Sequence, residues 1–180
     1  MQAFFNFLAQ IWSEVKPWYT INPWEAGLRI RWGRYVKVLV PGVHFQLPFL
    51  DSCHSLNVVP RVVNLPHQSL KTLDGKNIAL SAALAYAISD VEKVYLEVDD
   101  HDESLINLAL GHLADFVCSH PVASCSHDNI QTVVGDSLRE AVEPWGIELI
   151  SLYLTDLTDV KTFRLMHDQN PPKVPTLTIG

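Results

Sequence analysis

The first 16 residues place apolar side chains three and four positions apart, with polar residues between them. This spacing predicts an amphipathic helix. Sixteen helical residues extend about 24 Å, whereas a bilayer span needs about 20 mostly apolar residues, so we do not expect this helix to cross a membrane. The side chains expected to contact a membrane are Phe4, Phe5, Phe7, Leu8, Ile11, Trp12 and, just after the helix, Trp18.

Two interpretations of this helix stay open at this point. It lies in a membrane interface, or it packs its apolar face on protein. No basic residue precedes Lys16, which favours insertion by apolar burial over attraction to anionic lipid. Because there is neither a basic stretch at the start nor a small-residue cleavage site before Pro17, we expect no secretory signal.

After a predicted linker from Pro17 to Pro23, apolar and polar residues alternate in a series of short segments. This alternation predicts strands that bury one face. Strands are expected over residues 28–32, 36–40, 43–47, 54–58 and 61–65. The inward-facing residues of the second and third are expected to be Val36, Val38, Val40, Val43, Phe45 and Leu47. Turns are predicted at Gly33-Arg34 and Asp74-Gly75.

The segment from Asn77 to Ile88 gives the clearest strand pattern. Bulky residues such as Leu80 and Leu84 share one face, and alanines and a serine share the other. A face of small residues lets another element approach closely. We therefore expect a central strand covered on both sides, one of them by a helix.

The hydrophobic period then changes to that of helices. One helix is predicted from about Asp102 to just before Pro121, and a second from Asp128 to Pro144, followed by a strand over 147–156. Strands, then helices, then one returning strand indicate an α+β fold, a mainly antiparallel sheet with helices packed on one side. The predicted organisation is an amphipathic helix and linker over 1–20, one domain over 21–160 and a short tail over 161–180.

Composition and charge exclude several classes of protein and of partner. The chain of 180 residues is 48% hydrophobic and 18% charged, which excludes an intrinsically disordered protein. Its net charge of −7 leaves little basic surface to neutralise a phosphate backbone, so nucleic acid is not an expected partner. Three cysteines do not suggest a disulfide framework and favour a reducing compartment.

The sequence offers little support for catalysis. Residues 135–138, Gly-Asp-Ser-Leu, match the nucleophile block of one esterase class, but such a serine needs an exposed strand-to-helix turn. Here Ser137 falls in the middle of a predicted helix. Glycine patterns that cradle nucleotide phosphates are absent from the sequence. We therefore expect neither an enzyme nor a cofactor.

One cluster has the residue types of a zinc site. Two thiolates and two imidazoles make a workable tetrahedral set, but their spacing is not that of a common zinc finger. The alternative is a buried cysteine beside loop histidines. No metal is expected, and the weak candidates are Cys118, His120, Cys125 and His127. Carboxylates between Asp99 and Glu103 are interpreted as a helix N-terminus stabilised by the macrodipole.

Four blocks, in order, carry a family resemblance between about Ile21 and Asp159. They are RWGRY at 31–35, PGVHFQLPFLD at 41–51, LKTLDG at 70–75 and WGI at 145–147. Together they resemble the SPFH or band 7 family of membrane-associated scaffold proteins, which includes stomatin, prohibitin and flotillin.

This resemblance implies a non-catalytic scaffold that is peripheral to a membrane, on its cytoplasmic face, and that forms homo-oligomers. It also implies a role in organising lipids or regulating a membrane protease or channel. Family members commonly continue into a long coiled coil, whereas Pro171-Pro172 ends any helix here, so rings built through that helix are not expected. The block from Phe45 to Leu50 approaches the membrane or packs as an ordinary strand.

Two other functions stay open from the sequence. One is a soluble interaction module or assembly subunit whose N-terminal helix docks on protein. The other, more distant, is a zinc-binding module.

Overall fold

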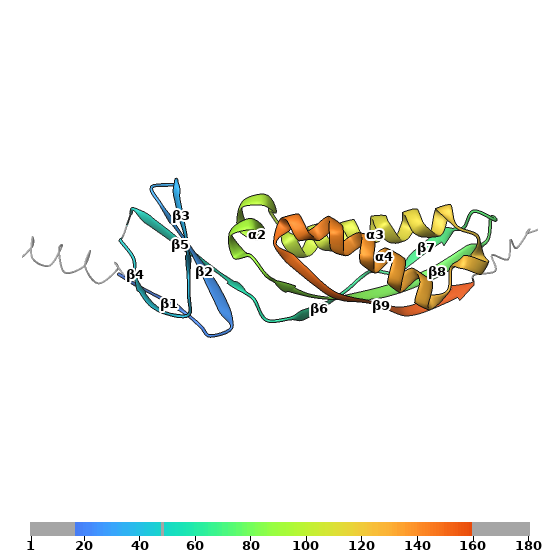
Figure 1. Cartoon of the computed structure of the whole chain (residues 1–180), viewed down its shortest axis with the longest axis horizontal. Coiled ribbons are helices and arrows are strands. Elements are labelled where there is room, and N and C mark those ends of the chain that lie inside the picture. Colours follow the sequence, from blue (N-terminus) through green and yellow to red (C-terminus); the bar gives the residue numbers. More distant parts are fainter. Residues whose placement is uncertain (1–16, 48, 160–180) are drawn as a thin grey trace, which may run out of the picture.

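The computed structural model describes residues 17–47 and 49–159. The predicted amphipathic helix, with Phe4, Phe5, Phe7, Leu8, Ile11 and Trp12, and the predicted tail from residue 161 lie outside the described residues. Figure 1 shows an elongated molecule with strands β1 to β5 at one end and the long helices over a second sheet at the other. We call residues 17–57 the β unit and residues 58–159 the α/β unit.

The β unit consists of two small antiparallel sheets. Strand β1 pairs with β4, and β2 lies between β3 and β5. The strands are β1 (Trp18–Ile21), β2 (Glu25–Arg31), β3 (Tyr35–Leu39), β4 (Gly42–Phe45) and β5 (Asp51–Asn57). Gly27 lets the sheets approach closely, because a Cβ there would lie 2.2 Å from the Ile21 Cδ1 atom.

The α/β unit is built on one long strand. Strand β8 pairs with β6 and β7 along one edge and with β9 along the other, all antiparallel. Its strands are β6 (Arg61–Asn64), β7 (Gln68–Lys71), β8 (Asn77–Ile88) and β9 (Ile147–Asp159). Its helices are α2 (Val91–Glu97), α3 (His101–Ser119) and α4 (His127–Val142), with short 3-10 turns over Val122–Ser124 and Glu143–Trp145.

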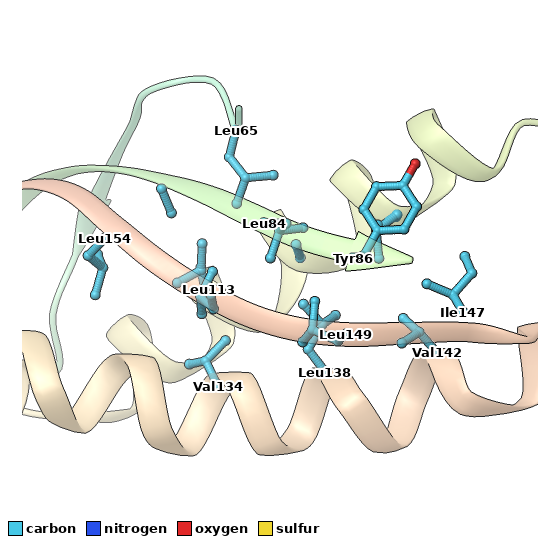
Figure 2. Packing of buried hydrophobic residues seen from close by; sticks show 14 of the residues in the cluster. Leu65, Leu84, Tyr86, Leu113, Val134, Leu138, Val142, Ile147, Leu149 and Leu154 are labelled. Atoms are coloured by element: carbon cyan, nitrogen blue, oxygen red, sulfur yellow. The ribbon is translucent and has the colours of Figure 1, made fainter. Parts of the chain in front are cut away.

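The core lies between α3, α4 and the bulky face of β8 and β9. Figure 2 shows Leu138 and Val142 of α4 beside β9, which carries Leu149, with Leu84 and Tyr86 on the neighbouring strand β8 of the same cluster. Leu28 of β2 belongs to the same cluster and is fully buried, so the core continues into the β unit. Burying each such side chain stabilises the fold by about 1.5–3 kcal/mol.

The predicted α+β architecture is confirmed. Strand β8 has the predicted bounds, and both long helices and the returning strand occur in the predicted order. The carboxylates before α3 cap the helix, since Asp100 accepts hydrogen bonds from the N–H groups of Asp102 and Glu103. Helix α2 was missed, although Asp90 caps it in the same way.

Two local predictions at the start of the β unit are wrong. The predicted linker contains strand β1, whose pairing with β4 across more than 20 residues leaves no local sequence pattern. The predicted turn at Gly33-Arg34 is centred one residue earlier: Trp32 and Gly33 have φ angles of 58° and 63°, and the Arg34 N–H donates to the Arg31 carbonyl.

The predicted burial of the valine face is confirmed only for Val36, which packs partly buried against the core. Val38, Val40 and Val43 are exposed, whereas Leu39 between them is buried. Strand β3 is an edge strand and β4 has one partner, so no layer covers these valines among the described residues. Leu39 instead faces Gly27 in the adjacent strand, close to Ile21.

The small face of β8 differs from its prediction too. Both long helices cover the bulky face (Figure 1), and the small face is turned away from them. Val62 and Tyr153, in register with Ala85 and Ala83 on this face, are exposed. Within the described chain the small face therefore lacks the second covering layer that we predicted.

Candidate membrane-contact surface

Large apolar side chains gather at the free end of the β unit. They are Trp18, Trp32, Phe45, Phe49 and Leu50, which we call the aromatic end. Phe49 is 95% exposed, Trp32 70% and Trp18 65%. Contiguous apolar side chains on a folded surface mark sites of contact with membranes or proteins.

A backbone hydrogen bond and a ring contact connect the segments that carry these side chains. The Trp32 N–H donates to the Leu50 carbonyl at 2.9 Å, which joins the β2–β3 turn to the loop before β5. The rings of Trp18 and Phe45 meet edge to face with centroids 6.0 Å apart. These contacts join Trp18 to Phe45 and the β2–β3 turn to the loop of Phe49 and Leu50, so residues from four segments are held at this end of the β unit.

Two of its aromatic residues adopt a backbone conformation that disfavours them. Trp32 and Phe49 have φ angles of 58° and 68°, and they are the non-glycine residues with positive φ in the described chain. This left-handed region costs a residue with a Cβ about 1–3 kcal/mol. Asparagine or glycine would relieve the strain, so large exposed aromatics at both positions point to a role outside folding.

A buried carboxylate fixes the loop that carries Phe49. Arg31 donates from Nε to Asp51 Oδ1 at 2.7 Å and from Nη2 to Oδ2 at 3.0 Å. The Leu47 N–H also donates to Asp51 Oδ2, at 3.1 Å. The hydrogen bonds from Arg31 lower the pKa of Asp51 to about 2 despite the burial of its side chain.

Charge is distributed very unevenly between the two units. The β unit has four basic and two acidic residues, a net charge of +2 with neutral histidines. The α/β unit has five basic and sixteen acidic residues, a net charge of −11. An anionic surface therefore attracts the end that carries the aromatic side chains and repels the other.

Of the predicted membrane-contact residues, Trp18 is the one that the structure describes, and it belongs to the aromatic end. Of the 45–50 block, Phe45 lies in β4 and Leu50 in the loop before β5, and both side chains are exposed. Sequence reasoning missed Trp32, because alternation assigned it to a buried strand face.

The four weak zinc candidates have separate surroundings. The ring of His120 stacks on Phe116, and His127 Nε2 contacts the Leu154 carbonyl at 3.0 Å. Cys118 is exposed, whereas Cys125 is buried, and burial raises the pKa of the Cys125 thiol. Among residues 17–47 and 49–159, no group of three or more candidate ligands could hold a metal ion.

Ser137 has a histidine neighbour that sequence reasoning did not foresee. Its Oγ lies 3.1 Å from His112 Nδ1, across the α3–α4 contact. Ser137 nevertheless lies inside α4, where the backbone N–H groups are used by the helix and none can stabilise an oxyanion. The pair has the proximity of a catalytic dyad without the rest of a hydrolase site.

A cavity of about 570 Å³ lies between β5 and the junction of α2 with α3. Asp100 and Asp102 line it, together with Leu56 and Tyr95. Both carboxylates have structural partners: Asp100 caps α3, and Asp102 accepts a hydrogen bond from the buried Tyr86 hydroxyl and pairs with Arg61 at 3.4 Å. These contacts account for Asp100 and Asp102 without a ligand, and Asp99 also lines the cavity.

None of the helices in the described part of the chain is long and apolar enough to span a bilayer. The family model of the SPFH domain / Band 7 family matches residues 19–167. The chain belongs to this family.

Several relatives of this SPFH-domain chain are known by sequence. An uncharacterized protein of Methanocaldococcus jannaschii is 31% identical over 137 residues, 75% of this chain and 69% of that protein. A putative band 7 family protein of Acanthamoeba polyphaga mimivirus is 22% identical over 143 residues, 78% of this chain and 47% of the relative. Human mitochondrial stomatin-like protein 2 is 26% identical over 141 residues, 74% of this chain. The match covers 38% of the human protein, so this chain spans well under half of its length.

Proposed function

We propose that this SPFH-domain protein is a non-catalytic scaffold, peripheral to a membrane on its cytoplasmic face. It self-associates and organises lipids or regulates a membrane protein such as a protease or channel. The observation that carries the proposal is the aromatic end, with two exposed aromatics, Trp32 and Phe49, in left-handed backbone. Such strain persists where a side chain is needed for contact rather than for folding.

The expected strength of attachment follows from the exposed apolar area. Transfer of a large apolar side chain out of water contributes about 1.5–3 kcal/mol when it is complete. Apart from Phe49, the side chains of the aromatic end are only partly exposed, and ordering costs oppose their transfer. A single copy therefore binds reversibly, and several linked copies bind firmly because each attachment raises the local concentration of the others.

An exposed sheet edge supports self-association. Strand β9 runs for 13 residues, and β8 is its partner in the sheet, with no strand paired to its other edge among the described residues. Its sequence contains neither proline nor lysine, although three acidic residues and two irregularities in its register with β8 limit the length that another strand could pair with. The remaining edge offers a place for contacts between copies.

The test is flotation of the full chain with phosphatidylcholine vesicles. The double variant Trp32→Asn/Phe49→Asn removes two aromatic contacts and places asparagine where left-handed backbone favours it. We expect it to unfold at higher denaturant concentration than the parent chain and yet to float less. Loss of flotation together with gained stability cannot result from misfolding.

The control is Val62→Asn/Leu73→Asn, which changes two apolar residues of the α/β unit whose side chains are also exposed. It should float like the parent chain. Equal flotation of parent and Trp32→Asn/Phe49→Asn would contradict membrane contact through the aromatic end. If the parent does not float, and removal of residues 1–16 dissociates its oligomers in light scattering, the chain is instead a soluble assembly subunit.

A further inference from the structure

Two cations face each other on the sheet that leads to the aromatic end. Arg29 of β2 and Lys37 of β3 are directly opposite in the register, with Cys53 of β5 on the other side of Arg29. Like charges directly opposite each other in a sheet are destabilising. Neither cation belongs to a direct ion pair in the described structure, because the neighbouring Asp51 binds Arg31 and interacts with Arg29 only at longer range.

The direction in which these cations point follows from the alternation of side chains. Ala26, Leu28 and Ile30 of β2 pack against the core, and α2 contacts β2 and β3. Arg29 and Lys37 occupy the opposite face of the strands. They therefore point away from the acidic α/β unit, toward the end of the molecule where Figure 1 shows β1 and β4.

The strand geometry limits how far these two cations lie from the aromatic end. Arg29 is three residues before Trp32, which directly follows β2, and strands rise about 3.3 Å per residue, so the two lie at most about 10 Å apart along the strand direction. The headgroup layer on each side of a bilayer is about 5–8 Å thick. When Trp32 lies at the boundary of the hydrocarbon, Arg29 and Lys37 therefore lie no more than about 10 Å from it, in or next to the layer that contains the lipid phosphates.

We propose that Arg29 and Lys37 bind the phosphates of anionic phospholipid headgroups and so orient the molecule on the membrane. The guanidinium group donates to phosphate oxygens in a bidentate manner, and the ammonium group adds a second charge. A phosphate between them offsets a repulsion that Asp51 compensates only from a distance. The inference rests on the proposed function, and it adds a preference for anionic lipid that an apolar surface alone does not have.

The test compares the full chain with Arg29→Gln/Lys37→Gln on two kinds of vesicle, phosphatidylcholine alone and phosphatidylcholine mixed with phosphatidylserine. A basic residue near an anionic surface contributes about fivefold in affinity, so the double variant should bind the mixed vesicles about 25-fold more weakly. Its binding to phosphatidylcholine should not change. The variant should remain folded, because the substitution relieves a repulsion, and thermal unfolding checks this.

The matched control is Lys71→Gln/Lys76→Gln, which makes the same change in net charge on exposed residues of the α/β unit. It should keep the preference for mixed vesicles, and added salt should weaken that preference in the parent and in this control. If both double variants lose the same affinity for the mixed vesicles, the phosphate site is refuted and the effect is one of overall charge.

The remaining outcomes separate this inference from the proposed function. If the parent binds both kinds of vesicle equally well, the phosphate site is refuted while membrane association stands. If the parent binds neither, the proposed function fails with it. If inorganic phosphate binds the parent in solution and abolishes its preference for mixed vesicles, the site is one for free phosphate, which overturns the membrane as its ligand.

Discussion

Replacing Asp51 with asparagine removes the charge that holds the aromatic end together. In the native chain the Asp51 carboxylate is fully buried and receives two hydrogen bonds from Arg31 and one from the Leu47 backbone. Asparagine keeps the shape and one acceptor oxygen. It cannot form the bidentate, charge-assisted pair with Arg31.

The magnitude follows from the pKa of the carboxyl group. The folded chain lowers the pKa of Asp51 from 3.8 to about 2, and each pKa unit corresponds to about 1.4 kcal/mol, so the pair contributes about 2.5 kcal/mol at most. The Arg31 side chain is 38% exposed, and water screens part of this interaction. We expect Asp51→Asn to lower the free energy of unfolding by about 1–2 kcal/mol at neutral pH, measured by urea denaturation.

The same reasoning fixes the pH dependence. Because the pKa of Asp51 is lower in the folded chain than in the unfolded chain, its stabilisation is fully present above about pH 4 and is lost as the pH falls toward about 2. Urea denaturation across this pH range should show that the parent's free energy of unfolding, higher than that of Asp51→Asn at neutral pH, falls toward it. The two unfolding free energies should converge at the acid end.

A second arginine–aspartate pair provides the control. Arg139 Nη1 lies 2.6 Å from Asp136 Oδ1, but both side chains are exposed. Asp136→Asn should therefore change the free energy of unfolding by less than about 0.5 kcal/mol. If Asp51→Asn costs no more than Asp136→Asn, or if its difference from the parent does not shrink at low pH, the structural role assigned to Asp51 is refuted.

Two further pairs of substitutions, each a test with its comparison variant, probe the packing of the α/β unit. Gly146 has a φ of 75°, and a Cβ there would lie 2.6 Å from the Asp90 carbonyl oxygen, so Gly146→Ala should destabilise the fold by more than about 2 kcal/mol in urea denaturation. Gly111→Ala, in open space within α3, should instead stabilise it by about 0.5–1 kcal/mol, and similar effects at both positions would contradict the geometry. Tyr86→Phe should cost about 1–2 kcal/mol by removing the hydrogen bond to Asp102, whereas Tyr35→Phe on the surface should cost nothing measurable. Burial and Asp102 raise the pKa of Tyr86 far above 10, so ultraviolet titration should show one tyrosine that resists ionisation in the parent and is missing from Tyr86→Phe.

The α/β unit was predictable because its signals are long and local. Twelve alternating residues define β8, and α3 and α4 carry an apolar stripe over several turns. The seven-residue α2 was missed because two turns are too short to show a period, although the Asp90 cap marks its start. Burial of the alternating residues in β8 follows from the helices that cover its bulky face.

The β unit was less predictable because its burial depends on which strands meet. Val38 and Val43 alternate as β8 does, yet they are exposed, since the sheets they belong to are narrow and no layer covers them in the described chain. The candidate surface was found only in part for the same reason. Local alternation can predict that Trp32 belongs to a strand or turn, but its left-handed backbone depends on the closure of the β2–β3 hairpin.

The most direct test of membrane contact through the aromatic end is quenching of single tryptophans by brominated lipids. One full-length variant keeps Trp32 and replaces Trp12, Trp18, Trp24 and Trp145 with phenylalanine, and a second keeps Trp145 alone. The proposed function predicts that vesicles of brominated phosphatidylcholine quench Trp32 strongly and leave Trp145, in the α/β unit, unquenched. Unquenched Trp32 in a variant that still floats with vesicles, or equal quenching of both tryptophans, would contradict it.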